Sequence, residues 1–249
     1  MGLPRGIEHF SKFFQSFEND YVIIGGAAAS VSLEDANLEF RVTKDIDVVL
    51  FTNGSKELNA KMTEYISLGG YNRNERTVDK PRYYRFSKPE NKNFPEIIEI
   101  FARIDSEIEL RKGQYIIPIQ NDSEVHLSAI LLDNEYFELI KSNAMKSLGG
   151  YSIIGPLANI CLKARAYREL QVRQDDKKKI DKHRNDVVRL ILALSIDDKI
   201  KLAGKPKEDI LNIISAVEGI DVLSIKQLIG NVLVKDEVSK ILKERFILD

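Results

Sequence analysis

The pattern of apolar residues changes near residue 125, and this change constrains the fold more than any other feature of the chain. Before it, short apolar or aromatic runs are bounded by Gly, Pro, Asn or charged residues, as is typical of strands. The expected strands are residues 21–24, 47–51, 83–86, 97–101 and 115–119. After it, apolar residues recur at helical spacing. We therefore expect an α+β fold, with one small mixed sheet in the first half.

The same periodicity predicts helices on both sides of that change. In the first half, helical spacing covers residues 7–17 and 55–68, which would flank the sheet. In the second half the expected helices are 156–170, 177–194, 207–217, 224–234 and 237–246. The sequence thus predicts an α+β domain over residues 1–150 and a C-terminal helical bundle over residues 151–249.

Composition indicates an ordinary globular protein. The chain has 249 residues, of which 43% are hydrophobic and 30% charged, with a net charge of −1. The single cysteine, Cys161, lies in an apolar stretch and is expected to be a small core residue in a reducing compartment. No leader or membrane-spanning stretch is recognisable, so we expect a cytoplasmic protein with no membrane partner.

Two carboxylates stand one residue apart at the start of the second expected strand. Side chains alternate between the faces of a strand, so Asp45 and Asp47 share one face while Ile46 points to the other. Adjacent carboxylates repel each other unless a cation lies between them. Oxygen ligands without Cys or His suit a hard ion such as Mg²⁺, which completes its coordination with water and phosphate. The pair therefore predicts a metal and phosphate site.

A glycine pair follows the first expected strand. Gly25 and Gly26 open a segment of small residues that can begin a helix, whose free N–H groups and dipole would accept a phosphate close to the backbone. The alternative is a glycine turn that merely permits close packing.

A third carboxylate, Glu99, is flanked by Ile98 and Ile100 and needs a partner if it is buried. That partner would be a metal shared with Asp45 and Asp47 on a neighbouring strand. The alternative is a salt bridge to Arg103 or Arg85. Glu96 would replace Glu99 if the register of the strand differed.

Together these features resemble the DNA polymerase β-type nucleotidyltransferase superfamily. They comprise a strand, a Gly-Gly turn, the motif Arg41-x-Thr43-x-Asp45-x-Asp47 and a later acid on an apolar strand. More narrowly, the chain is similar to the AbiEii-like toxins of abortive-infection systems, in which one C-terminal helix carries a Lys and the next a Lys-rich turn and an Asp. Lys163 and Asp186 match that pattern. His183 follows Lys182 where that group often has Asp.

The resemblance implies a metal-dependent enzyme that moves an NMP group from an NTP to an acceptor hydroxyl. Asp45, Asp47 and Glu99 would be the catalytic residues and would hold two Mg²⁺ ions, with Mn²⁺ as the alternative. Glu99 would be the general base. The expected sheet would then be a nucleotidyltransferase sheet.

The resemblance also assigns nucleotide-binding residues, some from the C-terminal domain. Gly25 and Gly26 would cradle the triphosphate, and Thr43 would touch a phosphate or hold the entrance of the strand. Lys163 would neutralise charge on the leaving group. Asp186 would position Lys163 or contact the nucleotide. The alternative for Lys163 and Asp186 is an exposed helix face with ion pairs.

The partners implied are an NTP, a tRNA or other RNA acceptor or a protein acceptor, and a cognate antitoxin. RNA could lie against a local run of basic residues, or those residues could form a solvated surface offset by neighbouring acids. The run comprises Arg165, Arg168, Arg173, Lys177, Lys178, Lys179, Lys182, Arg184 and Arg189. Two other functions fit the motifs: transfer to a small molecule such as an antibiotic, and a non-catalytic nucleotide-binding or protein-interaction module.

Overall fold

The computed structural model describes residues 2–51, 56–71, 83–101 and 133–248, and within them the chain has a mixed α/β fold. Within those residues, the main sheet has six strands in the order β3-β4-β2-β1-β6-β5. Its strands are β1 (Tyr21–Ile24), β2 (Asp45–Leu50), β3 (Tyr83–Ser87), β4 (Ile97–Phe101), β5 (Ala144–Lys146) and β6 (Ser152–Ile154). The central strand β1 runs antiparallel to β2 and parallel to β6, while β2 and β4 are parallel.

The first four strands confirm the sequence prediction to within two residues. The fifth predicted strand, residues 115–119, lies outside the described residues. Strands β5 and β6 were not predicted, because three residues are too few to show an alternating pattern. They pair with each other across residue 150, so the sheet receives a strand from beyond the predicted domain boundary.

Among the described residues before α6 (Pro156–Val172), five helical segments are present. They are α1 (Ile7–Phe13), a 3₁₀ turn (Gln15–Phe17), α2 (Gly25–Asp35), α3 (Lys56–Gly69) and α5 (Asn134–Ser142). Helix α2 follows β1 without a linker, so the small residues Ala27, Ala28 and Ala29 are fully buried against the sheet. Helix α5 has a strongly amphipathic pattern and is capped by Asp133, whose side chain accepts a hydrogen bond from the Glu135 N–H.

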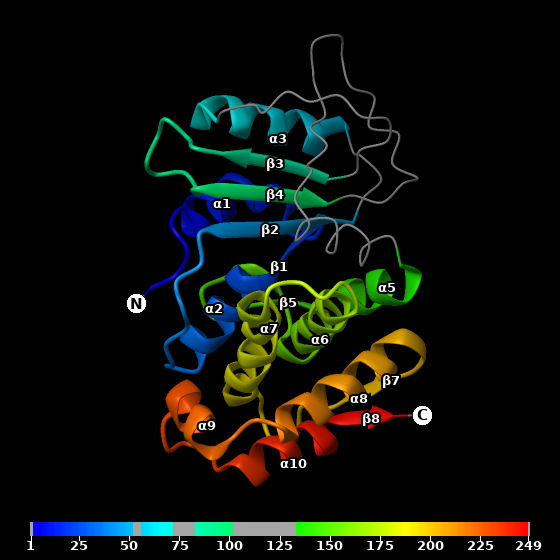
Figure 1. The fold of residues 1–249 in the computed structure, drawn as a ribbon. Helices are drawn as coiled ribbons and strands as arrows, with labels where there is room; N and C mark the ends of the chain where they lie inside the picture. Colours follow the sequence, from blue (N-terminus) through cyan, green and yellow to red (C-terminus); the bar gives the residue numbers. More distant parts are fainter. Residues whose placement is uncertain (1, 52–55, 72–82, 102–132, 249) are drawn as a thin grey trace.

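The C-terminal part contains α6 (Pro156–Val172), α7 (Lys177–Leu190), α8 (Gly204–Glu218), α9 (Val222–Ile229) and α10 (Lys235–Arg245). A 3₁₀ turn (Ile191–Ala193) follows α7 directly, so the helical segment ends within one residue of the predicted end at residue 194. Figure 1 shows α6 and α7 between the main sheet and helices α8 to α10. Cys161 on α6 is fully buried, which confirms that it is a core residue.

Two predicted helix ends are wrong. Helix α9 stops at Ile229 rather than at residue 234, because Gly230 adopts a positive φ of 66° that ends the helix. Phe246 does not continue α10 but begins strand β8 (Phe246–Leu248), which pairs with β7 (Ile200–Leu202). The C-terminal part is therefore helical with a small two-stranded parallel sheet. Within the described residues, no helix is both long and apolar enough to cross a lipid bilayer.

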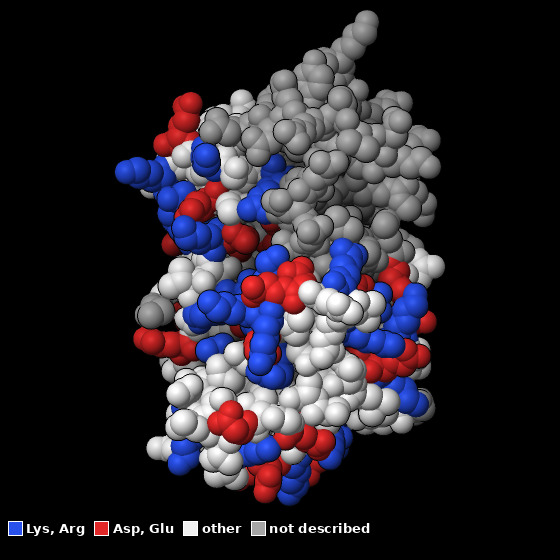
Figure 2. All heavy atoms as spheres, viewed as in Figure 1, with Lys and Arg blue, Asp and Glu red and all other residues white. Residues whose placement is uncertain are grey.

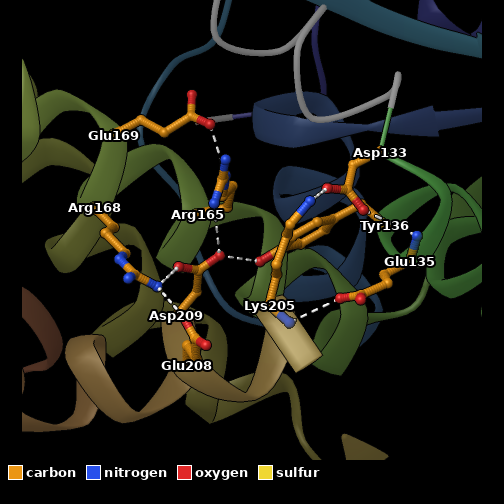
Figure 3. A network of polar contacts seen from close by, with 9 residues as sticks. All are labelled: Asp133, Glu135, Tyr136, Arg165, Arg168, Glu169, Lys205, Glu208 and Asp209. Carbon is orange, nitrogen blue, oxygen red and sulfur yellow. Dashed lines mark hydrogen bonds and ion pairs between the residues drawn. The ribbon is translucent and has the colours of Figure 1, made fainter. Parts of the chain in front are cut away.

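A buried polar network fixes α6 against α5 and α8 (Figure 3). Asp209 on α8 is fully buried, accepts a hydrogen bond of 2.6 Å from the Tyr136 hydroxyl on α5 and accepts one of 2.9 Å from Arg168 on α6. Arg165 approaches the same carboxylate at 3.6 Å. Since a buried charge is tolerated only with such partners, the network holds α6 in one position. That position matters because α6 carries Lys163.

Candidate functional site

The parallel pairing of β2 with β4 places two of the predicted acids side by side. Asp47 is the register partner of Glu99, so the two side chains project from the same face of adjacent strands. Glu99 is only 7% exposed. Arg85 on the neighbouring strand β3 contacts Glu99 at 2.9 Å, which is the salt bridge that the sequence offered as the alternative partner. Glu99 thus lies between a carboxylate and a guanidinium group.

Asp45 shares the strand face of Asp47 but lies opposite Ile97 rather than opposite an acid. In the described part of the chain, no three His, Cys, Asp or Glu side chains are arranged to hold one metal ion. The arrangement therefore brings Asp47 and Glu99 together, with Asp45 farther along β2. Glu96, the substitute for Glu99, instead pairs with Lys44 at an exposed position. Arg103 lies outside the described residues.

The glycine pair lies directly against the β2 motif. Gly25 has a φ of 69°, and a Cβ atom added to it would lie 2.3 Å from Asp47 Oδ2. A Cβ atom on Gly26 would lie 2.8 Å from Thr43 Oγ1. The first turn of α2 can approach these two side chains so closely only because both residues lack a side chain. The glycine pair therefore both permits close packing against β2 and forms the N-terminus of α2, so the two interpretations of the pair are compatible.

Substitution of Gly25 tests this close approach. We expect Gly25→Ala to lower the free energy of unfolding, by about 1–2 kcal/mol from the left-handed backbone alone, with a further loss because Asp47 must move. Chemical denaturation measures the effect. Gly219→Ala is the matched control, because Gly219 has a φ of −75° and an added Cβ would meet only ordinary contacts from 3.4 Å. An equal effect of the two substitutions would contradict the proposed packing.

A second cluster surrounds Asp186, which is fully buried on α7. Arg41 donates two hydrogen bonds to its carboxylate, at 2.9 and 2.8 Å. Lys163 Nζ on α6 lies 3.0 Å from Asp186 Oδ2, and Arg189 approaches Oδ1 at 3.9 Å. Lys163 is itself only 6% exposed. Lys163 and Asp186 do form an ion pair, but on a buried helix face rather than the exposed one that the alternative assumed.

The two clusters have opposite electrostatic character. Burial, the charges of Glu99 and Asp45 and a hydrogen bond with Glu99 raise the pKa of Asp47 well above its ordinary value. Burial acts in the same direction on Asp186, but Lys163 and Arg41 outweigh it and lower the pKa of Asp186. Three cations contact one carboxylate there. An excess of negative charge on β2 and β4 therefore faces an excess of positive charge from α6, α7 and Arg41.

Two further residues near Asp186 have lowered pKa values, to which the neighbouring cations contribute. Burial and the charge of Lys163 lower the pKa of His183 to about 3, so the imidazole is neutral at physiological pH. Burial, Arg41 and Lys163 also lower the pKa of Lys182. Burial is the largest cause of both shifts, and the neighbouring cations act in the same direction.

Sequence reasoning assigned no function to two residues of this site. Arg41 belongs to the quoted motif, but its contact with Asp186 spans 145 residues and no local pattern predicts it. Asn159 on α6 is fully buried, and its side chain donates a hydrogen bond of 3.0 Å to the carbonyl of Gly25. A polar residue in the apolar run of α6 was the signal that could have found it.

The basic run on α6 and α7 is largely paired. Arg165, Lys179 and Arg184 contact Glu169, Asp175 and Asp181, three of the acids expected to offset the run. On the face shown in Figure 2, acidic and basic side chains are intermixed.

Comparisons with protein-family models, curated proteins and solved structures find no significant match for this chain.

Proposed function

We propose that the chain is a metal-dependent nucleotidyltransferase, which transfers an NMP group from an NTP to an acceptor hydroxyl. The observation that carries the proposal is the register of β2 and β4, which sets Asp47 beside Glu99 at the point where Gly25 contacts Asp47. A carboxylate pair beside a glycine-rich helix start suits a metal-bound phosphate. The sequence resemblance supports the same chemistry, and the small mixed sheet is then a nucleotidyltransferase sheet.

The acids fit Mg²⁺ or Mn²⁺ in their donor chemistry. Mg²⁺ in phosphate-transfer sites usually takes one or two carboxylates and completes its octahedron with water and phosphate oxygens, so Asp47 and Glu99 would suffice for one ion. Asp45 would then complete a two-ion site together with the phosphates. A bound cation would relieve the repulsion that raises the pKa of Asp47. When bound, the metal would stabilise negative charge on the phosphates.

The chain's own residues would perform the remaining steps. The acceptor oxygen would attack the α-phosphorus as the bond between that phosphorus and the bridging oxygen to the β-phosphorus breaks, and pyrophosphate would leave. Glu99 would accept the proton of the acceptor hydroxyl. Gly25, Gly26 and Thr43 would hold the triphosphate. Lys163, oriented by Asp186, would neutralise charge on the leaving group.

We further propose an RNA such as tRNA as the acceptor, within a toxin that is controlled by an antitoxin. In the described part of the chain, four basic residues of α6, α7 and their connection have no ion-pair partner. They are Arg173, Lys177, Lys178 and Lys182. Unpaired cations grouped at one end of a helix pair are suited to a phosphate backbone. A protein hydroxyl or a small molecule such as an antibiotic is the alternative acceptor.

One observation favours a second candidate function, a module that binds nucleotide without transferring it. Glu99 is engaged by Arg85 and Lys163 by Asp186, so the proposed general base and the proposed phosphate-binding cation both have protein partners. Such a module would bind NTP in a Mg²⁺-dependent manner and yield no labelled product.

The test is transfer of label from each α-labelled NTP, with Mg²⁺ and total tRNA. We expect wild-type protein to label tRNA and the Asp45→Ala/Asp47→Ala variant to lose about 10³-fold or more in rate. The control is Glu57→Ala/Asp197→Ala, which removes two exposed carboxylates elsewhere and should retain the wild-type rate. NTP binding without transfer would favour the module. The absence of both binding and transfer, with every NTP tested, would refute the proposal.

A further inference from the structure

The Gly25 carbonyl is held by a buried side chain from a distant part of the chain. Asn159 lies on α6, has no exposed surface and donates from Nδ2 to the Gly25 oxygen over 3.0 Å. The two residues are 134 positions apart. This bond joins the turn between β1 and α2 to the helix that carries Lys163.

The bond sets the direction of the whole peptide group between Gly25 and Gly26. In a trans peptide the C=O and N–H groups point in opposite directions, so fixing the Gly25 carbonyl on Asn159 directs the Gly26 N–H away from Asn159. That N–H belongs to the first turn of α2, where donors have no acceptor within the helix. The Gly25 φ of 69° shows that the chain enters α2 through a left-handed backbone conformation.

Asn159 is a poor choice for packing alone. In the part of the chain that the structure describes, its Oδ1 atom is buried and has no hydrogen-bond partner. A buried acceptor without a partner costs stability, and a leucine of similar shape would avoid that cost. The hydrogen bond to Gly25 is therefore the feature that an asparagine supplies here and an apolar residue does not.

Asn159 and Lys163 lie one helical turn apart on the same face of α6. Lys163 contacts Asp186, and its charge partly offsets the rise in the pKa of Asp47, so it lies near the carboxylates. One helix face thus orients both a backbone donor and a buried cation toward one place.

We propose that Asn159 is a positioning residue, which holds the peptide between Gly25 and Gly26 so that the Gly26 N–H donates to a phosphate of the nucleotide. This inference rests on the proposed function. Without the bond the peptide could turn over and present the Gly25 carbonyl, which would repel a phosphate. Asn159 acts through the glycine turn and does not touch the substrate.

The test uses inorganic tripolyphosphate with Mg²⁺ as the probe and isothermal titration calorimetry on the full chain. We expect Asn159→Leu to weaken tripolyphosphate binding about tenfold, the effect of one hydrogen bond to a charged group. Mg²⁺ affinity measured without phosphate should stay unchanged, because the carboxylates are untouched. The control is Asn143→Ala, which removes a similar amide-to-carbonyl bond of 2.8 Å on α5.

A second measurement does not depend on a folded variant. In wild-type protein labelled with [¹⁵N]glycine, the Gly26 amide resonance should shift on addition of tripolyphosphate. An unshifted Gly26 resonance in phosphate-bound protein would overturn the inference, as would wild-type affinity in Asn159→Leu. In both cases label transfer by wild-type protein would show that the proposed function itself still stands.

Discussion

Replacement of Asp186 by alanine is expected to lower the free energy of unfolding by about 3–5 kcal/mol, the usual cost of removing one partner from a buried ion pair. The reason is the number of cations that depend on it. Arg41 and Lys163 both contact its fully buried carboxylate, and Arg189 lies within 4 Å. Without it, Lys163 would be a buried charge that has lost its ion-pair partner.

The matched control is Glu64→Ala, which removes an exposed carboxylate paired with Lys61 over 3.0 Å. We expect it to change the free energy of unfolding by about 0–1 kcal/mol. Urea denaturation of both variants measures the difference. Similar small effects would show that the cations around Asp186 find water or other partners, and would contradict its proposed structural importance.

The pH dependence of the Asp186 contribution has a definite sign. Lys163 and Arg41 lower the folded pKa of Asp186 below its ordinary value of 3.8, despite burial. Its contribution is therefore present at neutral pH and is lost as the pH falls below about 4. The stability difference between wild type and Asp186→Asn should be constant from about pH 5 to 8 and should shrink below about pH 4. A difference that kept its full neutral-pH value down to about pH 2 would contradict this linkage.

The sheet shows which parts of the site a sequence can predict. The strands carrying Asp47 and Glu99 were predicted from local apolar runs, and Glu99 was expected near the aspartates. The register that pairs Asp47 with Glu99 and leaves Asp45 opposite Ile97 depends on the alignment of two strands separated by α3 and β3. No pattern within either strand specifies that alignment.

The cationic cluster shows where prediction from sequence stops. Lys163 and Asp186 were assigned through a family resemblance, and the structure places them 3.0 Å apart. Arg41 and Asn159 received no assignment, because their contacts join segments more than 130 residues apart. Such contacts arise from helix packing, which amphipathic patterns indicate only in outline. Buried polar residues within apolar runs are the best local signal for them.

Replacement of Asp47 by asparagine is expected to separate stability from function. Burial and the charges of Glu99 and Asp45 raise the pKa of Asp47, so its ionised form is less favourable in the folded protein than in the unfolded chain. An asparagine keeps the shape, removes the repulsion and offers Glu99 a hydrogen-bond donor. We expect the free energy of unfolding at pH 7 to rise by about 0.5–2 kcal/mol, as is common when a functional site is neutralised.

The sign again follows from linkage, here in the opposite direction from Asp186. A raised pKa means that stability is highest when Asp47 is protonated and declines as the pH rises through its folded pKa. The gain from Asp47→Asn should therefore be absent below about pH 4 and should grow as the pH rises from there toward the folded pKa of Asp47. Asp197→Asn, at an exposed position, is the control and should show no such dependence.

The same variant should lose the proposed activity, because a neutral amide is a weak ligand for a hard cation. Label transfer is expected to fall about 10³-fold. Mg²⁺ should raise the melting temperature of wild-type protein, since a cation that binds only the folded state stabilises it, and should have little effect on Asp47→Asn. A variant that is less stable than wild type at pH 7 would instead mean that Asp47 stabilises the fold through its own contacts. The charge at this position would then be structural, and the site would need another explanation than a cation shared by Asp47 and Glu99.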